Sequence, residues 1–145
     1  MGRQRRRETL GQRPRRRPVN NDPRLIRHSE IRHSEIRRGE IWLIEFDPAR
    51  PNEANSTRPG IVITNNTANA RGTLVTAIPV TTNTDRVYPF QVLLANQQTD
   101  LNEDSKAQLE QVRSVSKSRL VKRIGQVPEE LMLEVGTKLR MHLEL

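Results

Sequence analysis

The chain has 145 residues, enough for one domain and short for two. It contains no cysteine, which excludes disulfides and thiolate chemistry, and no apolar run approaches the about 18 residues that a membrane span needs. Residues 1–38 hold 13 arginines and four acidic residues, whereas residues 39–145 hold 12 basic and 13 acidic residues. The net charge of +8 therefore belongs to the N-terminal segment, and it does not indicate what the remainder binds.

The first 25 residues are rich in arginine and poor in apolar residues. Such a segment buries too little surface to offset its conformational entropy, which predicts disorder. We therefore divide the chain into a disordered, Arg-rich tail over residues 1–37 and a folded domain over residues 38–145. No apolar stretch of a signal peptide follows the basic N-terminus, and the lack of cysteine fits a cytoplasmic protein with no membrane association.

Six segments of the folded domain have the pattern of strands, with β-branched and aromatic residues between turn signals. Pro59 is expected to limit the second strand at its start, and Pro89 within the fourth argues for an edge strand or a bulge. The predicted strands cover residues 40–46, 60–64, 73–80, 87–94, 107–114 and 120–127.

The period changes at Pro128, which opens a helix with acidic residues in its first turn. Four apolar residues recur every fourth position and form one stripe: Leu131, Val135, Leu139 and Leu143. We interpret Gly136, inside this helix, as allowing a close packing contact. The predicted fold class is thus mainly β with a C-terminal helix (α+β), built on a small, curled, mostly antiparallel sheet. The pattern leaves open whether that sheet closes into a barrel.

A polar loop ending in Arg58 precedes the second predicted strand, and Thr81 follows the third. If these strands are neighbours, the two side chains meet at the same end of the sheet. A guanidinium fork matches phosphate geometry, and a hydroxyl adds a donor and an acceptor beside it. Either residue alone would be an ordinary surface residue, but the pair predicts a site that holds a phosphodiester.

Five short motifs follow one another from residue 38 to residue 114 in the order of a known family. They are RGEIWL with FDP (38–48), Glu53 with RP at 58–59, IPVTT (78–82), YPF (88–90) and EQVRS (110–114). With these motifs, residues 38–145 resemble the MazF/PemK family of toxin endoribonucleases, the toxin halves of type II toxin–antitoxin systems. The tail is not covered by this resemblance.

The resemblance implies a compact SH3-like β-barrel, the fold shared by CcdB-like toxins. It also implies a homodimer that cuts single-stranded RNA at short recognition sequences without a metal or other cofactor. A cognate MazE-like antitoxin is the expected protein partner.

The resemblance assigns catalysis to Arg58, Thr81 and the acidic loop position Glu53. Whether Glu53 orients Arg58 or is only a solvated loop acid stays open at this point. Trp42 and Phe46 are interpreted as core residues. The residues expected to bind RNA are Thr82, Tyr88, Gln111 and Ser114.

The residue inventory agrees with this chemistry. RNA carries its own nucleophile in the 2′-OH, so the protein needs to move protons and to stabilise the charge of the phosphorane. The folded domain has one histidine, His142, and no Asp/Glu cluster at metal-ligand spacing. An arginine–hydroxyl centre therefore suits transesterification to a 2′,3′-cyclic phosphate and a 5′-OH, although a guanidinium keeps its proton and is a poor general base.

Two other functions stay open on the sequence. One is a gyrase-targeting toxin of the same fold, which would need no Arg58–Thr81 centre. The other is a non-catalytic RNA-binding module, in which the Arg-rich tail would supply affinity that falls steeply with salt.

Overall fold

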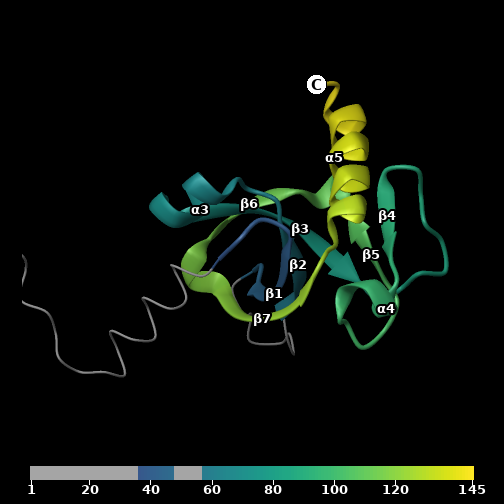
Figure 1. Ribbon diagram of the computed structural model, residues 1–145, viewed down its shortest axis with the longest axis horizontal. Helices are drawn as coiled ribbons and strands as arrows, with labels where there is room; N and C mark the ends of the chain where they lie inside the picture. Colours follow the sequence, from purple (N-terminus) through teal and green to yellow (C-terminus); the bar gives the residue numbers. More distant parts are fainter. Residues whose placement is uncertain (1–35, 48–56) are drawn as a thin grey trace, which may run out of the picture.

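The computed structural model describes residues 36–47 and 57–145, which form a curled sheet from which one long helix projects (Figure 1). The strands are β1 (Glu40–Glu45), β2 (Thr57–Val62), β3 (Leu74–Thr81), β4 (Gln91–Leu94), β5 (Ser105–Gln108), β6 (Arg113–Ser116) and β7 (Leu120–Gln126). The helices are α3 (Asn66–Arg71), α4 (Asn96–Thr99) and α5 (Glu129–Leu143), with 3-10 turns η1 (Leu109–Gln111) and η2 (Lys117–Arg119). The predicted disordered tail lies almost entirely outside the described residues.

The strands pair antiparallel in the order β4-β5-β3-β2-β1-β7, and β6 pairs with β3 beside β5. Figure 1 shows β7 curving around β1 and β2. Within the described ranges no ladder joins β4 to β7, so the curled sheet is not closed by hydrogen bonds. The predicted α+β fold with a C-terminal helix is confirmed, and the sheet is an open, strongly curled form of the expected barrel.

Two apolar clusters lie on opposite faces of the sheet, because successive side chains of a strand alternate between faces. The first cluster includes Ile41 and Ile61 and packs against Met132 and Val135 of α5. The second contains Trp42. The residues before and after Trp42 in β1 point to the opposite face. Burying each large side chain contributes about 1.5–3 kcal/mol.

The two aromatic residues predicted for the core are both in the second cluster. Trp42 and Phe46 are each 6% exposed. This cluster lies inside the curl of the sheet, together with Ile44, Val62 and Val75. The prediction for these two aromatic residues is confirmed.

The single strand predicted over residues 107–114 is wrong. Residues 105–108 and 113–116 are separate strands, and η1 lies between them. Both pair with β3, but β5 pairs at residues 80–81 and β6 at residues 74–77. The chain crosses the intervening gap in η1. Pro79 of β3 lies in this gap, where its missing N–H removes no ladder hydrogen bond on that side.

The two strands predicted next to Pro59 and Pro89, β2 and β4, also begin at other residues than predicted. β4 begins at Gln91, because Tyr88–Gln91 forms a turn closed by a 2.9 Å hydrogen bond from the Gln91 N–H to the Tyr88 carbonyl. The expectation of an edge strand is confirmed, since β4 ends the sheet order. β2 begins before Pro59 and includes Arg58. Pro59 is tolerated inside the strand because it pairs with β1 only, while the ladder to β3 starts at Gly60.

The helix α5 begins directly after Pro128 as predicted and ends at Leu143, and three of its four stripe residues contact the first cluster. Leu143, the fourth, is 47% exposed. The interpretation of Gly136 is wrong, because a Cβ at this position would meet no atom within 4 Å. None of the described helices is long and apolar enough to span a membrane.

Candidate active site

Arg58 and Thr81 lie at the same end of two neighbouring strands. The β2–β3 ladder pairs Gly60 with Pro79, and its antiparallel register, continued by two residues, places Arg58 opposite Thr81. On its other side Thr81 is paired with Lys106 of β5. Arg58, Thr81 and Lys106 therefore form a row across three adjacent strands, as the sequence predicted for the first two.

This row faces the inside of the curl, at the rim of the second cluster. Alternation along β2 puts Arg58 on the face of Val62, and alternation along β3 puts Thr81 on the face of Ala77. Arg58 is exposed and Thr81 is half-buried. The two polar groups are thus accessible to a ligand, and apolar packing lies directly behind them.

Three arginines gather near this end of β1, and two of them are engaged. Arg113 donates to the Phe46 carbonyl at 3.1 Å and forms an ion pair with Asp47 at 3.3 Å. Arg119 donates to the backbone carbonyl that ends β1, at 3.2 Å. Across the described part of the chain, the guanidinium of Arg58 makes neither a hydrogen bond nor an ion pair. Arg58 is therefore the arginine of this group that can bind an external anion with its whole fork.

The hydroxyl of Thr81 is oriented by the chain that follows β3. The Asn83 N–H donates to Thr81 Oγ1 at 3.3 Å, which is a local hydroxyl–backbone turn. A hydroxyl has one hydrogen to donate besides its acceptor lone pairs. Because Oγ1 is an acceptor in this turn, its own hydrogen is available to an oxygen of a bound phosphate.

Two of the residues predicted to bind RNA, Tyr88 and Gln111, lie on segments that one hydrogen-bond network joins. Gln111 is exposed at the end of η1, which contacts β3 and β4. Its neighbour Glu110 accepts a 2.8 Å hydrogen bond from the buried amide of Gln91, whose Oε1 accepts from the Tyr88 N–H at 3.1 Å. Tyr88, 40% exposed, and the η1 turn are thereby held to one another.

The remaining predicted residues are placed differently. Thr82 is exposed and directly follows β3. Ser114 pairs with Thr76 of β3, and alternation in β6 turns it to the face opposite that of Arg113. The structure therefore does not bring Ser114 to the row of Arg58 and Thr81. Glu53 lies outside the described residues.

Sequence reasoning missed Lys106 and Gln91. Lys106 is 7% exposed, and its ammonium donates to the Arg86 carbonyl at 2.6 Å. Gln91 is 2% exposed and uses both ends of its amide. For Lys106, the only signal in the sequence was that the alternation of polar and apolar residues begins two residues before Ala107. Alternation alone does not reveal that Lys106 is paired with Thr81.

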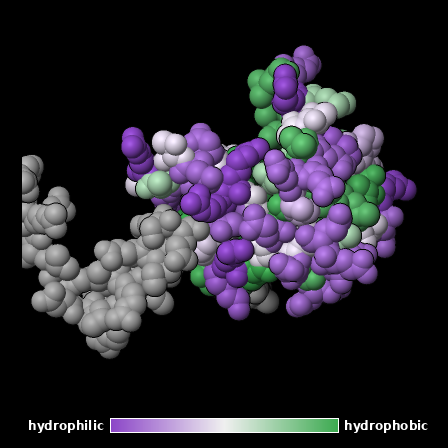
Figure 2. Space-filling view, in the orientation of Figure 1, coloured by the Kyte–Doolittle hydropathy of each residue, from purple (hydrophilic) through white to green (hydrophobic). Residues whose placement is uncertain are grey.

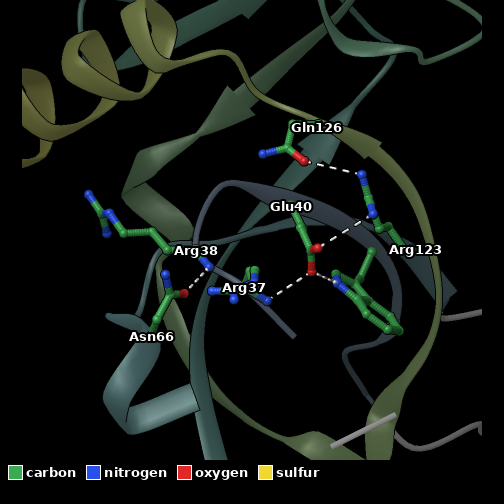
Figure 3. Close-up of polar contacts among 7 residues, drawn as sticks. Arg37, Arg38, Glu40, Asn66, Arg123 and Gln126 are labelled. Carbon is green, nitrogen blue, oxygen red and sulfur yellow. Dashed lines mark hydrogen bonds and ion pairs between the residues drawn. The ribbon is translucent and has the colours of Figure 1, made fainter. Parts of the chain in front are cut away.

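The opposite end of β1 is closed by its own charges (Figure 3). The Glu40 carboxylate is buried, and its Oε1 accepts from the Arg37 N–H at 2.8 Å and from Trp42 Nε1 at 2.9 Å. Its Oε2 lies 3.6 Å from Arg123 Nη1, and Arg123 in turn donates to Gln126. The Glu40 carboxylate is thus buried with three partners of its own chain. Within residues 36–47 and 57–145, no group of three or more His, Asp or Glu side chains could hold a metal ion.

The fold is a small curled sheet with a C-terminal helix, and an arginine–threonine pair accessible to a ligand lies at one end of the sheet. These features define the class of small β-toxins that the order of the motifs indicated. A profile of this class, described as the PemK-like, MazF-like toxin of type II toxin–antitoxin systems, matches residues 37–143. The chain belongs to this family.

Curated relatives and solved structures agree with this membership. Over 110 residues the chain is 46% identical to the endoribonuclease MazF9 of Mycobacterium tuberculosis (strain ATCC 25618 / H37Rv), with 72% of this chain and 93% of the relative covered. It is 31% identical over 106 residues to the endoribonuclease MazF of Staphylococcus epidermidis, with 72% and 88% covered. A MazE–MazF crystal structure from Deinococcus radiodurans superposes with a TM-score of 0.66 at 25% identity, covering 76% of this chain and 96% of that one.

Proposed function

We propose that the chain is a toxin endoribonuclease that cuts single-stranded RNA at short recognition sequences without a metal ion. The observation that carries this proposal is the guanidinium of Arg58, which has no partner among residues 36–47 and 57–145 and lies in register with the hydroxyl of Thr81. Family membership and the names of the two curated relatives support it. The exposed end of β2 is thus interpreted as the place where the scissile phosphate binds.

In the proposed reaction the ribose 2′-oxygen attacks the adjacent phosphorus, and the bond from phosphorus to the 5′-oxygen breaks. The 2′-OH loses its proton and the departing 5′-oxygen gains one, so the products are a 2′,3′-cyclic phosphate and a 5′-OH. Arg58 would neutralise the charge that grows on the non-bridging oxygens. Thr81 would donate its free hydrogen to one of these oxygens.

Base recognition and loop chemistry complete the proposal. Gln111 and Tyr88 would contact bases, because single-stranded RNA is read by stacking and by polar groups at base edges. Thr82 and Ser114 are kept as proposed RNA contacts, with Ser114 serving a nucleotide farther along the strand. Glu53 is proposed to orient Arg58 or to be a solvated acid of its loop.

The test is incubation of the purified chain with a long single-stranded RNA in excess EDTA, followed by mapping of cut sites and end groups. Discrete cuts with cyclic phosphate and 5′-OH ends are expected. Arg58→Ala should reduce the rate at least about 10³-fold, because an oriented transition-state donor contributes about 10²–10³ and Arg58 would also bind substrate. Arg71→Ala is the matched control, since Arg71 is an exposed arginine that follows the other end of β2.

Intact RNA from a folded sample would overturn the proposal. A sample that binds RNA without cutting it would favour the RNA-binding module, and one that inhibits gyrase would favour the gyrase-targeting toxin. Cleavage that needs a divalent cation would overturn the metal-independent chemistry while keeping the substrate class.

We also propose a homodimer that a cognate MazE-like antitoxin neutralises in the cytoplasm. The family description and the MazE–MazF structure support the antitoxin. Support for the dimer comes from α5, which extends beyond the sheet and carries a hydrophobic surface (Figure 2). Two of its apolar residues are largely exposed, Leu133 at 68% and Met141 at 71%, and so is the terminal Leu145 at 79%. Light scattering should give twice the mass of 16.7 kDa, and Met141→Glu should lower it.

A further inference from the structure

The segment that leads into β4 presents an exposed aromatic pair. The rings of Tyr88 and Phe90 are stacked, with centroids 5.4 Å apart and planes 5° from parallel. Tyr88 is 40% exposed and Phe90 is 37% exposed, whereas the two other aromatic residues of the chain, Trp42 and Phe46, are buried in the second cluster. Exposed aromatic rings next to a phosphate-binding site are suited to stacking nucleobases.

Two cations lie against this pair. The Arg86 guanidinium is 5.7 Å and the Lys106 ammonium 5.8 Å from the centre of the Tyr88 ring. Both distances are within the range of cation–π attraction, which adds to stacking on such platforms. Arg86 is exposed on the same segment as the rings, but Lys106 comes from β5.

Lys106 connects the aromatic pair with the proposed catalytic row. Its backbone is paired with Thr81, and its buried ammonium donates to the Arg86 carbonyl at 2.6 Å. A buried ammonium is stable only where such partners receive it. The side chain therefore spans from the position opposite Thr81 to the backbone and ring of the segment that carries Tyr88.

The geometry points to Lys106 as a positioning residue: we propose that it holds Tyr88 as a stacking platform for the nucleobase beside the phosphate bound by Arg58 and Thr81. This inference rests on the proposed function and extends it from the phosphate to the base. The platform reads no base edge, because any base has a face that can stack. Lys106 thus acts on affinity through Tyr88 and leaves base selectivity to other residues.

A double-mutant cycle on cleavage of a short RNA tests whether Lys106 acts through Tyr88. Tyr88→Leu and Lys106→Met should each lower kcat/KM about 5- to 150-fold, mainly by raising KM, because that is the range of one base–aromatic stack. The kcat/KM of the double variant should be no lower than that of the less active single variant. Lys106→Arg should retain most activity, since a guanidinium can also donate to a carbonyl and lie on a ring. Multiplicative losses in the double variant would overturn the proposal.

A second measurement does not need RNA. The Lys106 ammonium donates to the Arg86 carbonyl, and losing this contact should make the backbone at Arg86 easier for trypsin to bind. Lys106→Met should therefore speed cleavage at Arg86, followed by mass spectrometry, while Lys106→Arg should cleave like the unmodified chain. Unchanged cleavage at Arg86 in a folded Lys106→Met sample would overturn the positioning role. Lys106→Gln replaces Lys106→Met if the latter does not fold.

The two measurements separate failure of this inference from failure of the proposed function. If the unmodified chain cuts no RNA, the proposed function and the nucleobase platform both fall, whatever trypsin reports. If it cuts RNA and trypsin cleavage at Arg86 does not respond to Lys106, only the positioning role falls.

Discussion

At one end of β1, the Glu40 carboxylate is 5% exposed and receives the Arg37 N–H, the Trp42 indole and a guanidinium. At the other end, Arg58 is exposed and its fork has no partner among the described residues, while the neighbouring Arg119 and Arg113 donate to the carbonyls of Glu45 and Phe46. Both ends carry charge on the same pair of strands. Charge that is internally satisfied stabilises a fold, and charge left unsatisfied at the surface is available to a ligand.

After Arg58→Ala, the largest effect should come from the Thr81 hydroxyl at the open end. Thr81→Val keeps the side-chain shape and removes the donor, so the cleavage rate should fall about 10²- to 10³-fold. The free energy of unfolding should change by less than about 1 kcal/mol, because Thr81 is half-buried and ends its strand. Single-turnover cleavage and urea unfolding measure the two quantities. Thr67→Val, at an exposed threonine of α3, is the control, and an equal rate loss in both would show that Thr81 has no special role.

At the closed end, substitution of Glu40 should lower the free energy of unfolding. Glu40→Gln removes the ion pair with Arg123 and replaces a carboxylate acceptor by a neutral one, so unfolding should become easier by about 1–3 kcal/mol. Chemical denaturation followed by Trp42 fluorescence would report this, since the indole donates to Glu40. Glu45→Gln, at the exposed other end of the same strand, should have almost no effect. Equal stabilities for the two variants would contradict the assignment of a structural role to Glu40.

Packing between the two ends should affect stability to a similar degree. A Cβ on Gly60 would come within 2.7 Å of Phe46 Cζ and 2.8 Å of Ile44 Cδ1. Gly60→Ala should therefore destabilise the protein by about 1–3 kcal/mol through overpacking in the second cluster. Thermal unfolding measures this loss. A variant as stable as the unmodified chain would mean that Phe46 moves away readily, and that the apolar support behind Arg58 is loose.

The smallest effect should be a gain, at a position remote from both ends. A Cβ on Gly136 would meet nothing, and glycine inside a helix is about 0.5–1 kcal/mol less favourable than alanine. Gly136→Ala should raise the free energy of unfolding by about that amount and leave cleavage unchanged. A loss of stability would indicate that α5 is covered at Gly136 by another molecule, such as the second copy of a dimer.

Local patterns predicted the elements that depend on local rules. The strand at Glu40, the last strand and α5 follow from alternation, turn residues and a four-residue stripe. The division of residues 105–116 into two strands could not be predicted, because it depends on where each half pairs with β3. The start of β4 after Pro89 was not predicted, since the alternatives considered for Pro89 were an edge strand and a bulge within the strand.

The sequence likewise predicted part of the candidate site. The sequence placed Arg58 and Thr81 at strand ends, and the register brings them opposite one another. It could not place Lys106, because the partner of Thr81 on β5 is fixed by a non-local ladder. It also could not separate Ser114 from the row, because the break at η1 determines which face Ser114 takes.

The roles of Glu53 and of the tail stay predictions, since residues 48–56 and 1–35 lie outside the described structure. Removing residues 1–35 should leave cleavage unchanged if the tail is dispensable. The cut should not go further, because Ile36 is 3% exposed in the second cluster and the Arg37 N–H binds Glu40.

We propose that one end of the β1–β2 pair performs the chemistry and that the other end stabilises the fold. The most direct test measures both kcat/KM for RNA cleavage and the free energy of unfolding for Arg58→Ala and Glu40→Gln. We predict a crossed result: Arg58→Ala loses about 10³-fold in rate with stability within about 0.5 kcal/mol, and Glu40→Gln loses stability with a nearly unchanged rate for the folded protein. A folded Arg58→Ala variant that still cuts RNA at the original rate would contradict the account.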